Sequence, residues 1–157
     1  IYSNCNNSNK YEAIKYSKYK SGNLIAETKG FKQDSIIDRY SKLIRYYTED
    51  TSLSFFIKVN EINDSSVLYN GKYIPKQKEK LFSYNEESVR IIKYEYDMPN
   101  SQDEETYIFV NSKYEIVCIN YYVWGLSVFI ETQGASDLYK KILLDKRNRQ
   151  FLYFVPK

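Results

Sequence analysis

The sequence predicts an α+β domain in which one long and one short helix pack on one face of a single twisted antiparallel sheet of about six to seven strands. Residues 34–48 carry an apolar stripe at helical spacing, and most segments after residue 53 are short and rich in strand-forming residues. The links between those segments are too short for parallel crossovers, which favours an antiparallel order.

The predicted long helix covers residues 34–48. Its apolar residues fall at i, i+1, i+4, i+7, i+8 and i+11, which is one face of a helix: Ile36, Ile37, Tyr40, Leu43, Ile44 and Tyr47. Asp34 or Ser35 is placed to cap its N-terminus, because a side-chain oxygen there accepts from free backbone N–H groups. Asp38 suits the positive end of the helix dipole.

Residues 1–20 are predicted to be a polar N-terminal tether or a weak strand, and residues 21–157 a single domain. The apolar residues of the first segment are too irregular to fix a helix or a strand. A turn signal at 21–23 precedes a short predicted strand, 24–28, which Gly30 ends.

The remaining elements follow from alternation and turn residues. Apolar and polar residues alternate from Leu53 to Val59, which places one row of side chains inward on a strand. Asn70-Gly71 tolerates the positive φ angles of a type I′ turn and predicts a hairpin over 67–74. Pro75 opens a charged loop. Further strands are predicted at 88–98, 107–110, 115–124 and 126–131, then a short helix capped by Ser136 with Leu138, Ile142 and Leu143 inward, and a closing apolar segment at 151–155.

The composition excludes several classes of site. The chain has no histidine, so histidine-based triads, general bases and metal sites are excluded. Five scattered glycines form no phosphate-binding loop, and no Gly-x-Ser-x-Gly motif is present. The net charge of +3 gives too weak a positive field to predict a nucleic-acid partner. We expect no cofactor and no metal.

Two local features have a chemical and a structural interpretation. Asp97 and the acidic run Asp103, Glu104 and Glu105 supply oxygen ligands of the kind that calcium prefers, but their spacing matches no EF-hand, and a solvated hairpin tip is favoured. Cys118 lies between Val117 and Ile119 with no histidine to activate it, which favours core packing over a nucleophile.

Aromatic residues are concentrated in the run Asn120 to Gly125. Neighbours along a strand point to opposite faces, so Tyr122 and Trp124 are predicted on one face and Tyr121 on the other. Tyr94, Tyr96, Tyr107 and Tyr114 lie on the other predicted strands or beside their turn. One sheet face packs under the helices, and the other is either an exposed aromatic surface for a partner or a consequence of the strand propensity of tyrosine. Base stacking would need flanking positive charge, which these strands lack.

The N-terminal sequence Ile1-Tyr2-Ser3-Asn4-Cys5, followed by a polar stretch, resembles the processing site of bacterial lipoproteins. The resemblance implies that Cys5 is acylated and that the following residues act as a tether. Asn4 replaces the usual small residue before the cysteine, and Tyr2 replaces the usual leucine. The alternative is an ordinary frayed terminus or an artificial boundary of the chain.

These features together predict a non-enzymatic binding protein of the bacterial cell envelope with a protein partner. Immunity proteins, which cap the active site of a cognate toxin, are similar in size, single-domain form and lack of catalytic residues. That resemblance implies that Asp103, Glu104 and Glu105 enter a basic cleft of the toxin, and that Tyr121, Tyr122 and Trp124 supply buried anchors. The alternatives are a hydrolase that uses two carboxylates alone, and a structural lipoprotein without a specific ligand. The expected location is the periplasm or envelope, with the cytoplasm or secretion as alternatives.

Overall fold

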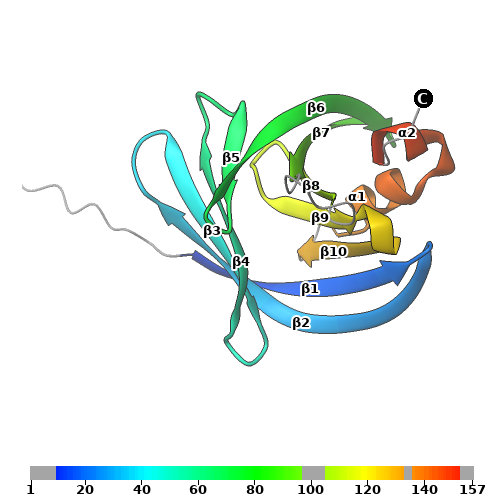
Figure 1. Cartoon of the computed structure of the whole chain (residues 1–157), viewed down its shortest axis with the longest axis horizontal. Coiled ribbons are helices and arrows are strands. Elements are labelled where there is room, and N and C mark those ends of the chain that lie inside the picture. Colours follow the sequence, from blue (N-terminus) through cyan, green and yellow to red (C-terminus); the bar gives the residue numbers. More distant parts are fainter. Residues whose placement is uncertain (1–9, 97–104, 133–135, 153–157) are drawn as a thin grey trace, which may run out of the picture.

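The computed structural model describes residues 10–96, 105–132 and 136–152, which form a closed barrel of ten antiparallel strands followed by short helices (Figure 1). Every strand pairs with its neighbours in chain order, and β1 closes the barrel by pairing with β10. The strands are β1 (Lys10–Lys20), β2 (Asn23–Ile36), β3 (Ser41–Thr48), β4 (Leu53–Asn60), β5 (Ser66–Tyr69), β6 (Lys72–Tyr84), β7 (Glu87–Tyr96), β8 (Thr106–Val110), β9 (Ile116–Tyr121) and β10 (Leu126–Thr132). The helices are the 3-10 turn η1 (Tyr122–Trp124), α1 (Ser136–Leu144), the 3-10 turn η2 (Lys146–Asn148) and α2 (Arg149–Leu152).

The predicted α+β fold with an open sheet of six to seven strands is wrong, because the sheet has ten strands and closes on itself. The predicted helix at 34–48 is also wrong: its residues form the end of β2, a turn, and β3. Ile44 and Tyr46 alternate inward along β3, whereas Ile36 and Ile37 lie exposed at the turn. The apparent helical stripe therefore combined two strand faces with a turn.

Other local predictions fail for related reasons. Gly30 lies inside β2 rather than at its end, and the charged segment after Pro75 belongs to β6 rather than to a loop. From Lys76 to Tyr84, β6 pairs with β7 alone, so most of its side chains remain in water and are polar. The described start of the predicted closing segment, at Phe151, belongs to α2.

Several predicted elements are confirmed. The Asn70-Gly71 turn joins β5 to β6, with φ of 47° and 83° at its two residues. The alternating segment forms β4, and the short C-terminal helix α1 buries Ile142 and Leu143. Residues 10–20, predicted as part of a tether or a weak strand, form β1, which is bonded on both edges.

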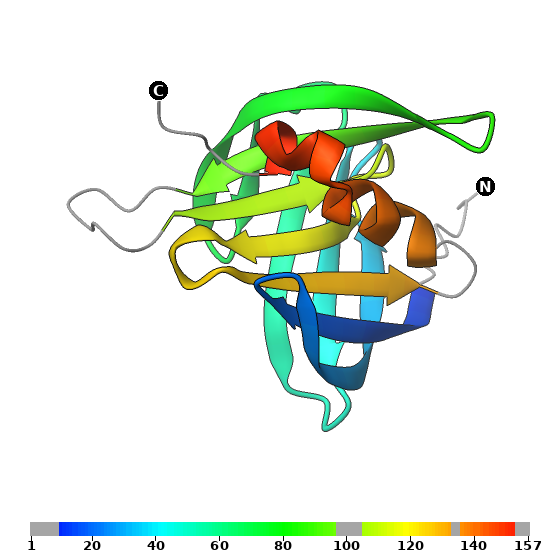
Figure 2. The same cartoon turned by 90° about the vertical axis from the view of Figure 1, so that its right-hand side faces the viewer.

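The strands support two apolar clusters, one on each side of the sheet. The first fills the barrel and is built from inward residues that include Ile44, Tyr46, Ile57, Ile92, Tyr94 and Ile108. The second lies on the outer face of the sheet beneath α1 and α2, and includes Phe82, Ile91, Phe109, Cys118, Phe129 and Phe151. Figure 2 shows both helices lying across the middle strands, and Figure 1 shows β1–β2 and β6–β7 curving past them on opposite sides.

The buried tyrosines of the barrel interior place their hydroxyls on polar partners. The backbone N–H of Ile116 donates to Tyr46 Oη at 2.7 Å, and Tyr94 Oη donates to the carbonyl of Asp64 at 2.8 Å. Tyr16 Oη donates to the carbonyl of Tyr47 at 2.9 Å. These three tyrosines thus fill the wide interior, and among the described residues no buried tyrosine hydroxyl is left unpaired.

Gly30 makes the Tyr16 contact possible. A Cβ at this position would lie 2.1 Å from the carbonyl oxygen of Tyr47 and 2.6 Å from Cε2 of Tyr16. The backbone of Gly30 is not in the left-handed region, so the requirement for glycine is purely steric.

We expect Gly30→Ala to lower the free energy of unfolding by about 2–3 kcal/mol, because a methyl group here overpacks the barrel wall. The measurement is urea denaturation. Gly22→Ala is the matched control: its φ of +82° is unfavourable for alanine, but no atom lies within 4 Å. The control should lose about 1 kcal/mol, and equal losses in the two variants would contradict the steric explanation.

Candidate functional site

The predicted aromatic residues gather where β9 ends. Tyr121 is the last residue of β9, and its ring stacks on Trp124 with centroids 6.1 Å apart and an interplanar angle of 23°. Gly125 adopts φ +58° and its N–H donates to the carbonyl of Tyr122 at 3.1 Å, which closes the η1 turn. The indole of Trp124 is left 60% exposed.

Tyr122 turns away from this stack. Its ring meets Tyr107 edge to face at 6.2 Å, within the outer cluster. The prediction that Tyr122 and Trp124 share a strand face is therefore wrong, because the strand stops at Tyr121 and η1 rotates the following side chains. Tyr121 lies on the other side of the sheet from Tyr122 and packs against the barrel interior.

Of the predicted acidic residues, Glu105 lies beside the aromatic turn. Its carbonyl accepts from the N–H of Tyr122 at 3.2 Å, and Tyr107 Oη donates to Glu105 Oε2 at 3.3 Å. Asp103 and Glu104 lie outside the described residues, as do Asp97 and Cys5. The structure thus brings one predicted acidic residue and all three predicted aromatic residues to one end of the barrel.

Two further apolar residues join this end. The N–H of Ser21 donates to the carbonyl of Gly125 at 2.9 Å, which ties the β1–β2 turn to η1. We define the rim patch as Leu24, Ile25, Val123 and Trp124, whose exposed fractions range from 47% to 60%. Leu24 and Ile25 were predicted only as parts of a short strand, because their place beside η1 depends on a contact across 104 residues (Ser21 to Gly125).

The structure also forms a charged cluster around Lys32, which the sequence did not predict. The ammonium of Lys32 lies 2.8 Å from Glu115, 3.2 Å from Glu12 and 3.2 Å from Asp34, and the side chain is 3% exposed. Burial opposes the charge of Lys32, but Glu115 and Asp34 raise its pKa above the ordinary value. Burial likewise opposes ionisation of Glu115, but Lys32 lowers the pKa of that carboxyl below its usual range.

Strand register explains this Lys32 cluster. Glu12 and Lys32 are directly opposite in the β1–β2 ladder, and Lys32 is opposite Tyr46 in the β2–β3 ladder. All three share the inward face near one end of the barrel. Glu115, the residue just before β9, adds a carboxylate from a segment far away in the sequence. The Lys32 ammonium lies between these carboxylates and pairs with all of them, and the four side chains line a pocket of about 350 Å³.

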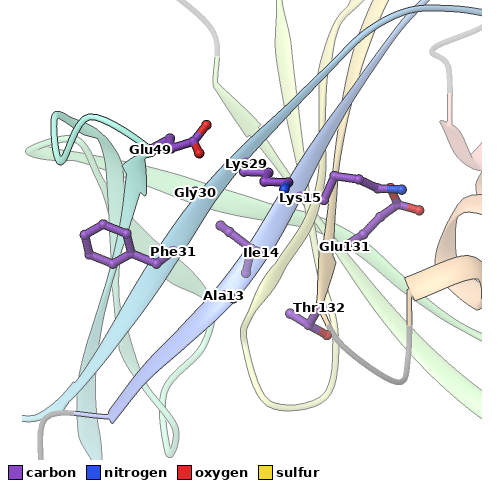
Figure 3. Close-up of a pocket in the computed structure, with 9 residues that line it drawn as sticks. All are labelled: Ala13, Ile14, Lys15, Lys29, Gly30, Phe31, Glu49, Glu131 and Thr132. Carbon is purple, nitrogen blue, oxygen red and sulfur yellow. The ribbon is translucent and has the colours of Figure 1, made fainter.

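A groove of about 560 Å³ crosses the outside of β1 and β2 (Figure 3). Lys15 reaches toward Glu131 at one end, and Phe31 and Glu49 mark the other. Glu131 is buried and accepts from Ser17, and its carboxylate lies 3.2 Å from Lys15 and 2.9 Å from Lys140. Burial alone would raise the pKa of Glu131, but Ser17, Lys140 and Lys15 outweigh burial and hold this pKa below the usual glutamate value. Glu131 therefore stays an anion, and it joins β1, β10 and α1. We assign this carboxylate a structural role.

Other candidate chemistry finds no support in the structure. Cys118 is buried among apolar side chains of the outer cluster, and burial raises the pKa of its thiol. Within the described ranges, no group of three or more acidic or cysteine side chains is arranged to hold a metal ion. None of the helices in the described part of the chain is both long and apolar enough to cross a membrane.

Comparison with known proteins gives no further guide, because no protein-family model, curated protein or solved structure matches this chain.

Replacing Lys32 tests the charge balance of the cluster around it. We expect Lys32→Met to lower the free energy of unfolding at pH 7 by about 3 kcal/mol, because it leaves Glu115, Glu12 and Asp34 without their shared cation. The wild-type protein loses stability as the pH falls through the lowered pKa of Glu115. In the variant Glu115 lies half-buried beside two other carboxylates without a cation, so the pKa of Glu115 rises and stability should increase from pH 7 toward pH 5.

Urea denaturation across this pH range makes the measurement. Lys113→Met is the matched control, since Lys113 is exposed beside Glu115 on the lining of the pocket at this cluster, acts on Glu115 only through its longer-range charge, and lies within ion-pair distance of no described carboxylate. A Lys32→Met variant whose stability stays constant or falls from pH 7 to pH 5 would contradict the assignment of an ion-paired cluster.

Proposed function

We propose that this chain is a non-enzymatic binding protein that engages a protein partner through the rim patch. The observation that carries the proposal is Trp124, a tryptophan that is 60% exposed and supported from behind by the stacked ring of Tyr121. Exposed aromatic residues of this kind are the commonest energetic anchors of protein interfaces. A rigid support lowers the entropy lost when such an anchor is buried.

The surroundings of Trp124 favour a protein partner. Val123 is exposed in the same turn, and Leu24 and Ile25 are exposed in β2 just after the β1–β2 turn, which the Ser21–Gly125 hydrogen bond holds beside η1. Exposed apolar residues that gather in one region mark interaction sites on folded proteins. Glu105 lies near this end of the barrel: its carbonyl accepts from the N–H of Tyr122, and its carboxylate accepts from Tyr107 Oη. A carboxylate near an apolar patch suits a basic partner, because charges around an interface increase the rate of association.

The immunity or inhibitor type, held at the cell envelope by a lipid on Cys5, remains the form of binding protein that we favour. A protein of that type needs a stable scaffold and one complementary surface, and a barrel with a filled interior provides the first. The arrangement around Lys32 also favours binding over hydrolysis, because the carboxylates of Glu12, Asp34 and Glu115, which line a pocket there, all share one cation.

Trp124→Ala should weaken binding to the partner by at least tenfold, which corresponds to about 1.4 kcal/mol or more. The partner is first captured from the source organism with the wild-type chain and identified, and its Kd is then measured for purified variants. Leu81→Ala is the control, because Leu81 is an exposed apolar residue on the projecting β6 strand, outside the rim patch. Equal affinity for wild type and Trp124→Ala would refute the rim patch as the binding surface.

A further inference from the structure

The outer cluster contains a buried lysine. Lys93 is 1% exposed, and its Nζ donates to the carbonyl of Phe151 in α2 at 2.9 Å. The same ammonium lies 3.9 Å from the centroid of the Tyr107 ring. Among the residues that the structure describes, no carboxylate lies within ion-pair distance of Lys93.

Lys93 lies directly under the anchor of the C-terminal helices. The ring of Phe151 packs edge to face on Phe82 at 5.2 Å and against Phe109 at 5.7 Å. Lys78 Nζ also approaches this ring, at 5.3 Å. Closing α2 onto the sheet therefore gains apolar contact for Phe151 and, in the same step, removes the Lys93 ammonium from water.

The charges around Lys93 do not compensate for this desolvation. Burial and the like charge of Lys78 lower the pKa of Lys93 to about 8, against the smaller opposing effects of Glu95 and Glu105. The rings of Tyr107 and Phe109, with centroids 3.9 Å and 5.7 Å from the ammonium, attract the cation but carry no opposite charge. At neutral pH Lys93 is still protonated, so closing α2 buries a cation. This burial costs free energy that a neutral side chain at the same position would not cost.

We propose that residues 136–152, the C-terminal cap, open and close on the outer face of the sheet, and that the buried Lys93 ammonium keeps the open state accessible at neutral pH. Opening hydrates the ammonium and uncovers the aromatic side chains of Phe82 and Phe109, together with the thiol of Cys118. The cap is thereby a conformational device that controls access to a second apolar surface, separate from the rim patch.

The pH dependence has a definite sign. Lys93 binds its proton more weakly in the closed state than in the open one, so the charge disfavours closure fully below pH 8. The penalty disappears as the pH rises from about 8 toward the ordinary lysine value of 10.5. Alkaline conditions should therefore tighten the cap.

Cys118 supplies the probe, because it lies beneath the cap and the only other cysteine, Cys5, is removed by Cys5→Ser. The rate of thiol labelling of native Cys5→Ser protein at pH 7 reports the open population. Adding Lys93→Met should slow this labelling about tenfold or more, since one unit of pKa difference corresponds to a tenfold change. Lys80→Met is the control, because the Lys80 ammonium lies 5.0 Å from the Phe82 ring centroid but is exposed.

Two further measurements distinguish opening of the cap from unfolding of the whole barrel. In a Cys5→Ser, Cys118→Ser background, Ile119→Cys places a thiol on the barrel-facing side of β9 and should label much more slowly than Cys118. Raising the pH from 7 to 9 should increase the protection of Cys118, relative to the unfolded chain, in the Lys93-containing protein but not in Lys93→Met. Faster or unchanged labelling in Lys93→Met, or equal labelling on the two sides of β9, would overturn the proposal.

Discussion

Closure of the sheet through β1 is the constraint on which the rest of the structure depends. β1 pairs with β2 along one edge and with β10 along the other, so the first strand of the chain joins the last. Without this strand, β2 and β10 would both expose free backbone edges, which are costly and prone to aggregation. Closure also fixes which side of every strand faces inward, because side chains alternate along each strand.

The wide interior that closure creates determines how tyrosine is used. Inward positions take large side chains such as Tyr46 and Tyr94, whose hydroxyls reach backbone groups of β9 and of the β4–β5 connection. At one end, the inward rows of β1 and β2 bring Glu12 and Lys32 together. The outer face of the middle strands is also apolar, because α1 and α2 cover it. Aromatic residues are therefore needed on both faces of the same sheet.

Local signals in the sequence were sufficient for some of the fold. Asn70-Gly71 predicts its turn because only a few residues tolerate positive φ at both positions, and the alternation from Leu53 predicts β4. The segment 34–48 was misassigned because Ile36, Ile37 and Tyr40 imitate a helical stripe when read with β3, although they belong to a strand end and an exposed turn. Deciding between the two requires the pairing of β2 with β3, which is not local.

The candidate site divides in the same way. Strand alternation placed Tyr121 and Trp124 on opposite faces, but their rings stack, because the short η1 turn and Gly125 end the strand at Tyr121 and bring Trp124 back over it. The same turn separates Tyr122 from Trp124. The cluster around Lys32 joins side chains from β1, β2 and the segment before β9, and only the register of a closed barrel brings them together. Lys93 depends instead on the packing of α2 against the outer face of the sheet. The site residues that sequence reasoning missed are those that depend on contacts between segments far apart in the sequence.

Amide hydrogen exchange of β1 tests closure most directly. If β1 is bonded on both edges, the amides of Tyr16 to Lys18, which lie between β2 and β10, should be protected to nearly the same degree as those of β8 and β9. Exchange of these β1 amides at the rate of a frayed terminus, with β8 and β9 still protected, would contradict a closed barrel and everything argued from it.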